Sequence, residues 1–91
     1  MDFLDHADIT GRIRGLVIML DDKITIEQSR AVDELIDAAD FGAALQLLAD
    51  DLANSATPVP DDLRVDFERL ATRMEIRDAV MSALARCPVD A

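Results

Sequence analysis

Hydrophobic residues recur at the spacing of an α-helix in the first part of the chain. The set consists of Ile9, Ile13, Leu16, Val17 and Leu20. This spacing predicts a helix from about Asp8 to Leu20, with Asp5 or Asp8 available as its N-cap. Gly11 and Gly15 lie four residues apart on one side, where they either weaken the helix slightly or let a neighbour pack closely.

A capping box marks the start of a second helix. Thr25 would accept a hydrogen bond from the Gln28 amide while the Gln28 side chain reaches back to the Thr25 backbone. The apolar stripe that follows consists of Val32, Leu35, Ile36 and Ala39. The pattern predicts a helix from about Ile26 to Ala39.

A third helix is expected almost directly after the second, with Asp40 as its N-cap. Its apolar face consists of Phe41, Ala44, Leu45, Leu48 and Leu52. The very short link implies a sharp corner between the two helices. Phe41 would fill that corner, and Gly42 would let the two backbones approach each other.

The second half of the chain shows two apolar stripes after a loop at residues 54–60. The first consists of Leu63, Phe67, Leu70, Ala71 and Met74, and the second of Ile76, Val80, Ala83, Leu84 and Cys87. The second stripe is out of phase by two residues, which predicts a break near 74–76 and a fifth helix from about Arg77 to Arg86. One long kinked helix would also satisfy the pattern. Residues 1–91 are therefore expected to form a single all-α domain, a compact bundle of four to five short helices, with 76–91 as a C-terminal extension.

Composition agrees with helices and limits the compartment. The chain is 51% hydrophobic, with three Phe and no Tyr or Trp, a composition that favours helices over a sheet. The acidic N-terminus lacks the features of a signal peptide. The uncharged run at residues 41–49, which no other run exceeds in length, is far short of the roughly 20 residues of a membrane-spanning helix. We expect a soluble, cytoplasmic protein that does not bind membranes.

Residues suited to catalysis or metal binding are sparse. His6, near a terminus expected to fray, is the only histidine, and Cys87 is the only cysteine, so a transition-metal site is not expected. Adjacent carboxylates such as Asp50 and Asp51 point about 100° apart on a helix and are poorly placed to share a proton. The chain also lacks a calcium loop, a glycine-rich phosphate loop and the Asp-Ser-Leu setting of acyl carrier proteins. We therefore expect no enzyme activity and no cofactor, and the net charge of −10 argues against nucleic-acid binding.

Carboxylates are concentrated in the middle of the chain. Between Arg30 and Arg64 there are eight Asp or Glu residues and no Lys or Arg. Such a run can simply be a solvated face, but it can also attract a basic protein surface and speed its capture. Several of these acids have no stabilising role in their own helix, because they lie at like-charge spacing or near helix C-termini. The candidate partner-binding residues are Asp33, Asp37, Asp50, Asp51, Asp21 and Asp22.

The segment 32–52 reads V-D-E-L-I-D-A-A-D-F-G-A-A-L-Q-L-L-A-D-D-L. It resembles the central signature of MafI-type immunity proteins, which are small acidic helical proteins that neutralise a cognate secreted toxin. The match is carried by Leu35, Ile36, Asp37, Asp40, Phe41, Gly42, Ala44, Leu45, Leu48 and Leu52. The resemblance extends over about Ile9 to Ile76.

The resemblance implies a protein partner, namely the C-terminal toxin domain of a contact-dependent growth inhibition or related polymorphic toxin system. Several toxins paired with this family resemble EndoU-type ribonucleases, whose RNA-binding clefts are basic. The implied function is to cover such a surface, as a monomer or weak homodimer. Two alternatives stay open from the sequence: a regulatory or adaptor domain with no toxin partner, and a nucleic-acid mimic that binds a DNA-binding protein.

Overall fold

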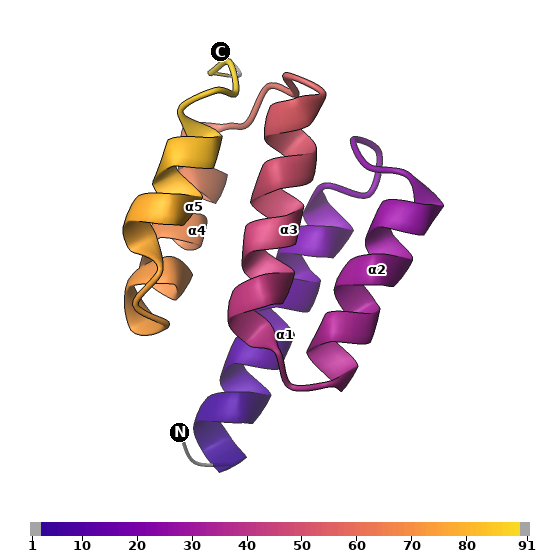
Figure 1. Cartoon of the computed structure of the whole chain (residues 1–91), viewed down its shortest axis with the longest axis vertical. Coiled ribbons are helices and arrows are strands. Elements are labelled where there is room, and N and C mark those ends of the chain that lie inside the picture. Colours follow the sequence, from indigo (N-terminus) through magenta and orange to yellow (C-terminus); the bar gives the residue numbers. More distant parts are fainter. Residues whose placement is uncertain (1–2, 90–91) are drawn as a thin grey trace.

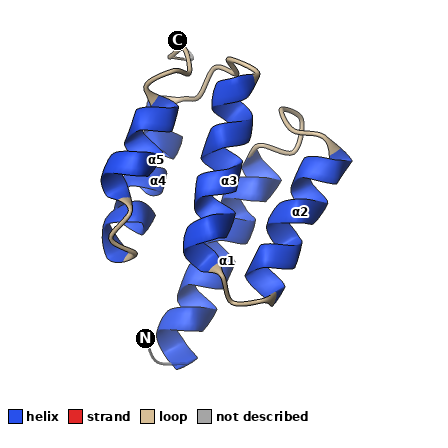
Figure 2. Ribbon diagram, in the orientation of Figure 1, coloured by secondary structure: helices blue, strands red, loops and turns tan. Residues whose placement is uncertain are grey.

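Helices form where the apolar stripes predict them. The computed structural model describes residues 3–89, and the helices within that range are α1 (Phe3–Met19), α2 (Ile26–Asp37), α3 (Phe41–Asn54), α4 (Asp61–Arg73) and α5 (Arg77–Leu84). Figure 2 shows helices and loops and no strand in the part of the chain that the structure describes. The only β-type pairing between residues 3 and 89 is an isolated bridge between Val59 and Val89. The prediction of an all-α bundle is confirmed.

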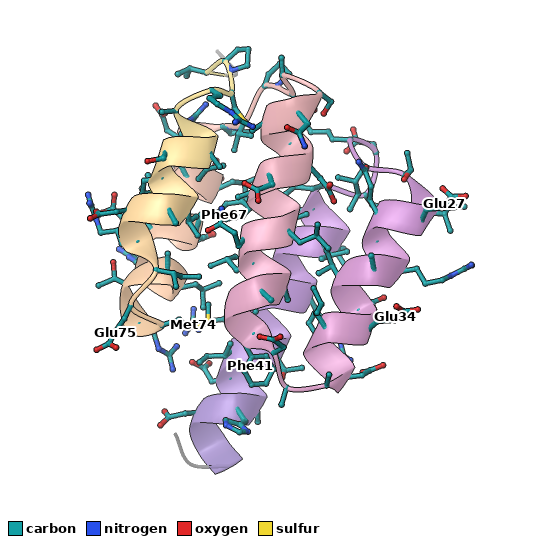
Figure 3. The ribbon with its side chains drawn as sticks, in the orientation of Figure 1. Glu27, Glu34, Phe41, Phe67, Met74 and Glu75 are labelled. Atoms are coloured by element: carbon teal, nitrogen blue, oxygen red, sulfur yellow. The ribbon has the colours of Figure 1, made fainter. Side chains whose placement is uncertain are left out.

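Helix α3 lies in the middle of the bundle, between α2 on one side and the α4–α5 pair on the other, with α1 behind it (Figure 1). Its buried residues are Phe41, Ala44, Leu45, Leu48, Ala49, Leu52 and Ala53. Most residues of the predicted stripes on the other helices supply the rest of the core, but Ala39 is exposed, and Val59 of the loop is buried as well. Phe67 of α4, for example, is fully buried and lies between α4 and α3 (Figure 3).

Three helices end with a non-glycine residue in the left-handed backbone region. The residues are Ala39, Ala56 and Glu75, with φ of 59°, 50° and 61°. After each of them the next amide donates to a carbonyl five residues back, as in Asp40 N to Leu35 O at 2.9 Å. This is the Schellman end of a helix. It separates α4 from α5 at Glu75, so these are two helices and not one kinked helix.

Several helix ends differ from the predictions. Helix α1 begins at Phe3, and Asp8 lies inside it, so Asp8 is not an N-cap. Helices α2 and α5 each end two residues earlier than expected. The capping box at Thr25 and Gln28 is confirmed. Asp40 occupies the N-cap position of α3 but makes no side-chain capping bond; its ψ is 67°, whereas the capping Thr25 is extended with ψ of 164°.

The corner between α2 and α3 depends on Phe41 and not on glycine. Phe41 is buried, and its ring lies 5.3 Å from that of His6 in an edge-on contact, so His6 is packed and not frayed. A Cβ at Gly42 would meet only the Ile76 side chain at 3.8 Å, an ordinary contact. The expected close approach of backbones at Gly42 is therefore wrong. A Cβ at Gly11 would likewise meet nothing within 4 Å.

Arg64 joins α4 to the end of α5 and to the segment after it. Its Nε donates to Val59 O at 3.0 Å and its Nη1 to Leu84 O at 2.7 Å. Its Nη2 donates to Cys87 O at 2.7 Å and to Pro88 O at 2.8 Å. One planar guanidinium thus satisfies carbonyls at the C-terminal end of α5, where cations are favoured.

Replacing Arg64 with Met should lower the free energy of unfolding by about 2–3 kcal/mol, because the carbonyls lose charge-assisted hydrogen bonds. Arg64→Lys should recover little, since an ammonium lacks the fork geometry. Urea unfolding measures the change, and hydrogen exchange at the Val59 amide, which donates to Pro88 O, reports the loss locally. Arg86→Met is the control, because the side chain of exposed Arg86 bonds to Asn54 alone among residues 3–89. Equal losses in the Arg64 and Arg86 variants would contradict this role.

Replacing Ala39 with Gly should raise the free energy of unfolding by about 1 kcal/mol, because glycine adopts φ of 59° without the Cβ clash. For a domain of this size that corresponds to a rise in Tm of about 4–8 °C. The adjacent Ala38 has φ of −81° and serves as the matched control. Ala38→Gly should give no increase, and thermal unfolding followed by circular dichroism compares the two.

Candidate functional site

A groove runs between α1 and α2 and holds two of the candidate carboxylates. Its volume is about 420 Å³. Its lining consists of Arg14, Val17, Ile18, Asp21, Ser29 and Asp33. We call it the acidic groove. Neither Asp21 nor Asp33 forms an ion pair with any residue between 3 and 89, so both carboxylates are available to a cation from outside.

Arg14 of α1 pairs with Asp37 at the edge of this groove. Its Nη2 lies 3.0 Å from Asp37 Oδ1, although the two residues are 23 positions apart. Asp37 has no cation along its own helix, and its partner comes from α1 instead. The side chains are 49% and 72% exposed, so the pair contributes at most about 1 kcal/mol. Its main effect is to cancel the charge of Asp37 on this face.

Large apolar side chains are exposed on α1 and at the start of α2, and one of them, Ile18, lines the acidic groove. Ile18 in its lining is 74% exposed, and Met19, which ends α1, is 57% exposed. Ile26 at the start of α2 is 72% exposed, and Asp21 and Asp22 lie in the turn between. Apolar residues surrounded by polar ones are typical of the centre and rim of a protein interface. The exposure of Ile18 could have been predicted from the sequence, because Ile18 lies outside the apolar stripe of its helix.

Asp50 and Asp51 lie on α3 and do not line the acidic groove. Asp50 Oδ1 accepts a hydrogen bond from Gln46 at 3.0 Å, and the same amide nitrogen reaches the Ala79 carbonyl of α5 at 3.4 Å. Asp51 is half-buried; burial raises the pKa of its carboxyl, and neighbouring Asp50 raises it further. The six candidate residues therefore do not form one cluster. The acidic groove brings together Asp21 and Asp33, with Asp37 beside Arg14 and Asp22 in the adjoining turn.

A larger groove, which sequence reasoning missed, lies between α1 and α4. It has a volume of about 480 Å³. Its lining consists of Arg12, Gly15, Leu16, Met19, Asp66, Arg69, Leu70 and Arg73. We call it the α1–α4 groove. Asp8 accepts hydrogen bonds from Arg73 and Arg12, and these bonds, that from Arg73 first, hold the pKa of the Asp8 carboxyl below its usual value.

Other kinds of site find little support in the part of the chain that the structure describes. From residue 3 to 89 no group of three or more His, Cys, Asp or Glu side chains could hold a metal ion. No helix in that range is both long and apolar enough to cross a membrane. Cys87 is buried, as expected for an apolar filler, and burial raises the pKa of its thiol.

Comparison with protein families, curated proteins and solved structures found no match to this chain.

Replacing Asp51 with Asn should stabilise the protein at pH 7. The variant removes a partly desolvated charge from the last turn of α3, where the helix dipole disfavours an anion by about 0.3–1 kcal/mol. Because the folded-state pKa is raised, wild type takes up this proton more readily when folded. The destabilisation caused by the charged Asp51 carboxyl is therefore present above the raised pKa. It disappears as the pH falls below the ordinary pKa of a carboxyl group. Urea unfolding at pH 7 and at pH 3.5 measures the difference in stability between the variant and wild type, which should be smaller at pH 3.5.

Asp61→Asn is the control for that experiment. Asp61 lies in the first turn of α4, where a negative charge is favourable, so its removal should lower stability at pH 7. A gain of the same size in both variants would mean that reduced net charge alone explains the effect of Asp51→Asn.

Proposed function

We propose that this chain is an immunity protein that binds a cognate toxin domain and blocks it by covering a basic surface. The observation that carries the proposal is the acidic groove, where two carboxylates without ion-pair partners among residues 3–89 adjoin the exposed Ile18 side chain. The resemblance of residues 32–52 to MafI-type immunity proteins supplies the partner class.

Charge favours capture of a basic partner. The chain carries a net charge of −10, and the acid run between Arg30 and Arg64 includes Asp33 of the groove. Long-range attraction raises the encounter rate with a basic surface by one or more orders of magnitude at low salt. The apolar residues then supply contact area that excludes water, which lowers the dissociation rate.

A ribonuclease of the EndoU type suits this chemistry. A surface that binds RNA is basic because it must neutralise phosphates. Asp21 and Asp33 would take the place of those phosphates, with Ile18 packed against the toxin beside them. Asp37 ranks lower than the other two as a contact, because Arg14 already cancels its charge. Asp50 and Asp51 would reach the toxin only if the interface extended over α3.

The proposal predicts a toxin gene beside the gene of this chain, and the test is binding to the C-terminal domain of that toxin, with nuclease activity followed in parallel. The double variant Asp21→Asn/Asp33→Asn should associate roughly tenfold more slowly at low salt and lose most of that difference at high salt. The control is Asp61→Asn/Asp62→Asn, which removes the same charge from exposed residues at the start of α4. The control should associate at nearly the wild-type rate.

Ile18→Ser addresses the apolar part of the same surface. It should leave the association rate unchanged and raise the dissociation rate about tenfold or more, because the apolar contact is lost after encounter. Ile18 is 74% exposed, so the fold should be unaffected. Equal behaviour of the groove and control charge variants would place the interface elsewhere. Absence of any binding to the neighbouring toxin domain would favour a regulatory or adaptor role instead.

A further inference from the structure

The α1–α4 groove differs chemically from the acidic groove. Arginines outnumber acids in its lining, with Arg12, Arg69 and Arg73 against Asp66. We propose that this groove binds an unbranched amphiphilic carboxylate, with the alkyl chain along the apolar floor and the carboxylate at the arginines. This site is separate from the proposed toxin-binding surface and does not depend on it.

The space in this groove is present because Gly15, which lines it, has no side chain. Gly15 lines it, and a Cβ placed there would meet nothing within 4 Å. Leu16 and Leu70, both 3% exposed, form the floor, and Met19 is an exposed and flexible wall. The volume of about 480 Å³ lies in the range of small-molecule sites.

Arginine side chains can receive a carboxylate at the rim. Asp8 accepts from Arg12 Nε at 3.1 Å and from Arg73 Nη1 at 2.7 Å, which fixes both side chains. Each guanidinium has five N–H donors, so both keep donors that Asp8 does not use. Arg69 forms no ion pair or hydrogen bond with any residue between 3 and 89 and is free to bind a carboxylate bidentately.

The acids near this rim limit the charge of the occupant. Asp66 lines the groove, Asp8 binds two of its arginines, and Asp5 lies 3.7 Å from Arg73. These three acids balance the three arginines, so this rim carries no net charge. A single carboxylate would bind here through the pre-organised N–H donors and not through long-range attraction. A second copy of this chain would bring a net charge of −10, which opposes self-association.

The length of the α1–α4 groove determines the length of the alkyl chain that fits in it. The lining spans Arg12 to Met19 on α1 and Asp66 to Arg73 on α4, each about 10 Å at 1.5 Å per residue. An alkyl chain of about eight carbons covers that distance at roughly 1.3 Å per carbon. Each methylene buried should raise affinity about fourfold, and longer chains should gain nothing more.

The experiment titrates the full chain with hexanoate, octanoate, decanoate and dodecanoate below their micelle concentrations, with amide chemical shifts as the readout. Decyltrimethylammonium is the cationic counterpart. Gly15→Leu fills the groove and should weaken octanoate binding at least tenfold. Gly11→Leu is the matched control, because Gly11 lies on the same helix with equally open surroundings but outside the lining. It should bind as wild type does, and both changes favour helix.

The carboxylate contact is tested by Arg69→Gln, which should weaken octanoate binding about tenfold, a loss typical of a charge-assisted contact. Arg30→Gln on α2 is the control of equal charge change and should have no effect. The proposal is wrong if no carboxylate binds, if decyltrimethylammonium binds as tightly as decanoate, or if both leucine variants behave alike. It is also wrong if sedimentation shows a wild-type dimer that Gly15→Leu abolishes, since a second copy would then occupy the groove.

Discussion

Burial of α3 on several sides is the constraint on which the rest of the fold depends. Its uncharged run at residues 41–49 provides no polar face, so α1, α2, α4 and α5 all pack against it. Each large side chain fully buried there contributes about 1.5–3 kcal/mol relative to exposure. Because α3 occupies the centre, α1 and α4 are left with a groove between them on the far side. The two grooves therefore result from the way α1, α2, α4 and α5 pack around α3.

Local patterns predicted the helices well because apolar stripes report which face is buried. The phase shift after Met74 correctly placed a break that no glycine or proline marks. Helix ends were harder, because long-range contacts set them. Helix α1 extends to Phe3 with Asp8 bonded to Arg73, a partner 65 positions away, and no local rule shows that pair. The backbone at Asp40 follows the Schellman end of α2, so its side chain does not cap α3 as the sequence suggested.

The candidate site was predictable in its chemistry but not in its layout. The sequence indicates Asp33 by its like-charge spacing with Asp37, and Asp21 by its place at the C-terminal end of the first helix. Only the packing of α1 against α2 shows that both line one groove. The same packing gives Asp37 a cation from another helix. The grooves themselves depend on the distances between helices. The spacing of apolar residues along the sequence does not determine those distances.

The contacts near the two ends of the chain differ in their dependence on pH. Asp8 has its pKa lowered by hydrogen bonds from Arg73 and then Arg12, so the stability it contributes is present above the ordinary carboxyl pKa and is lost as the pH falls through the lowered value. Arg64, by contrast, donates to neutral carbonyls, which take up no proton as the pH falls. Falling pH therefore weakens the bonds of Arg73 and Arg12 to Asp8, while the hydrogen bonds of Arg64 to the C-terminal segment persist. The contact made by Asp8 depends on pH because its acceptor is a carboxylate, and the attachment of the C-terminal segment does not because its acceptors are carbonyls.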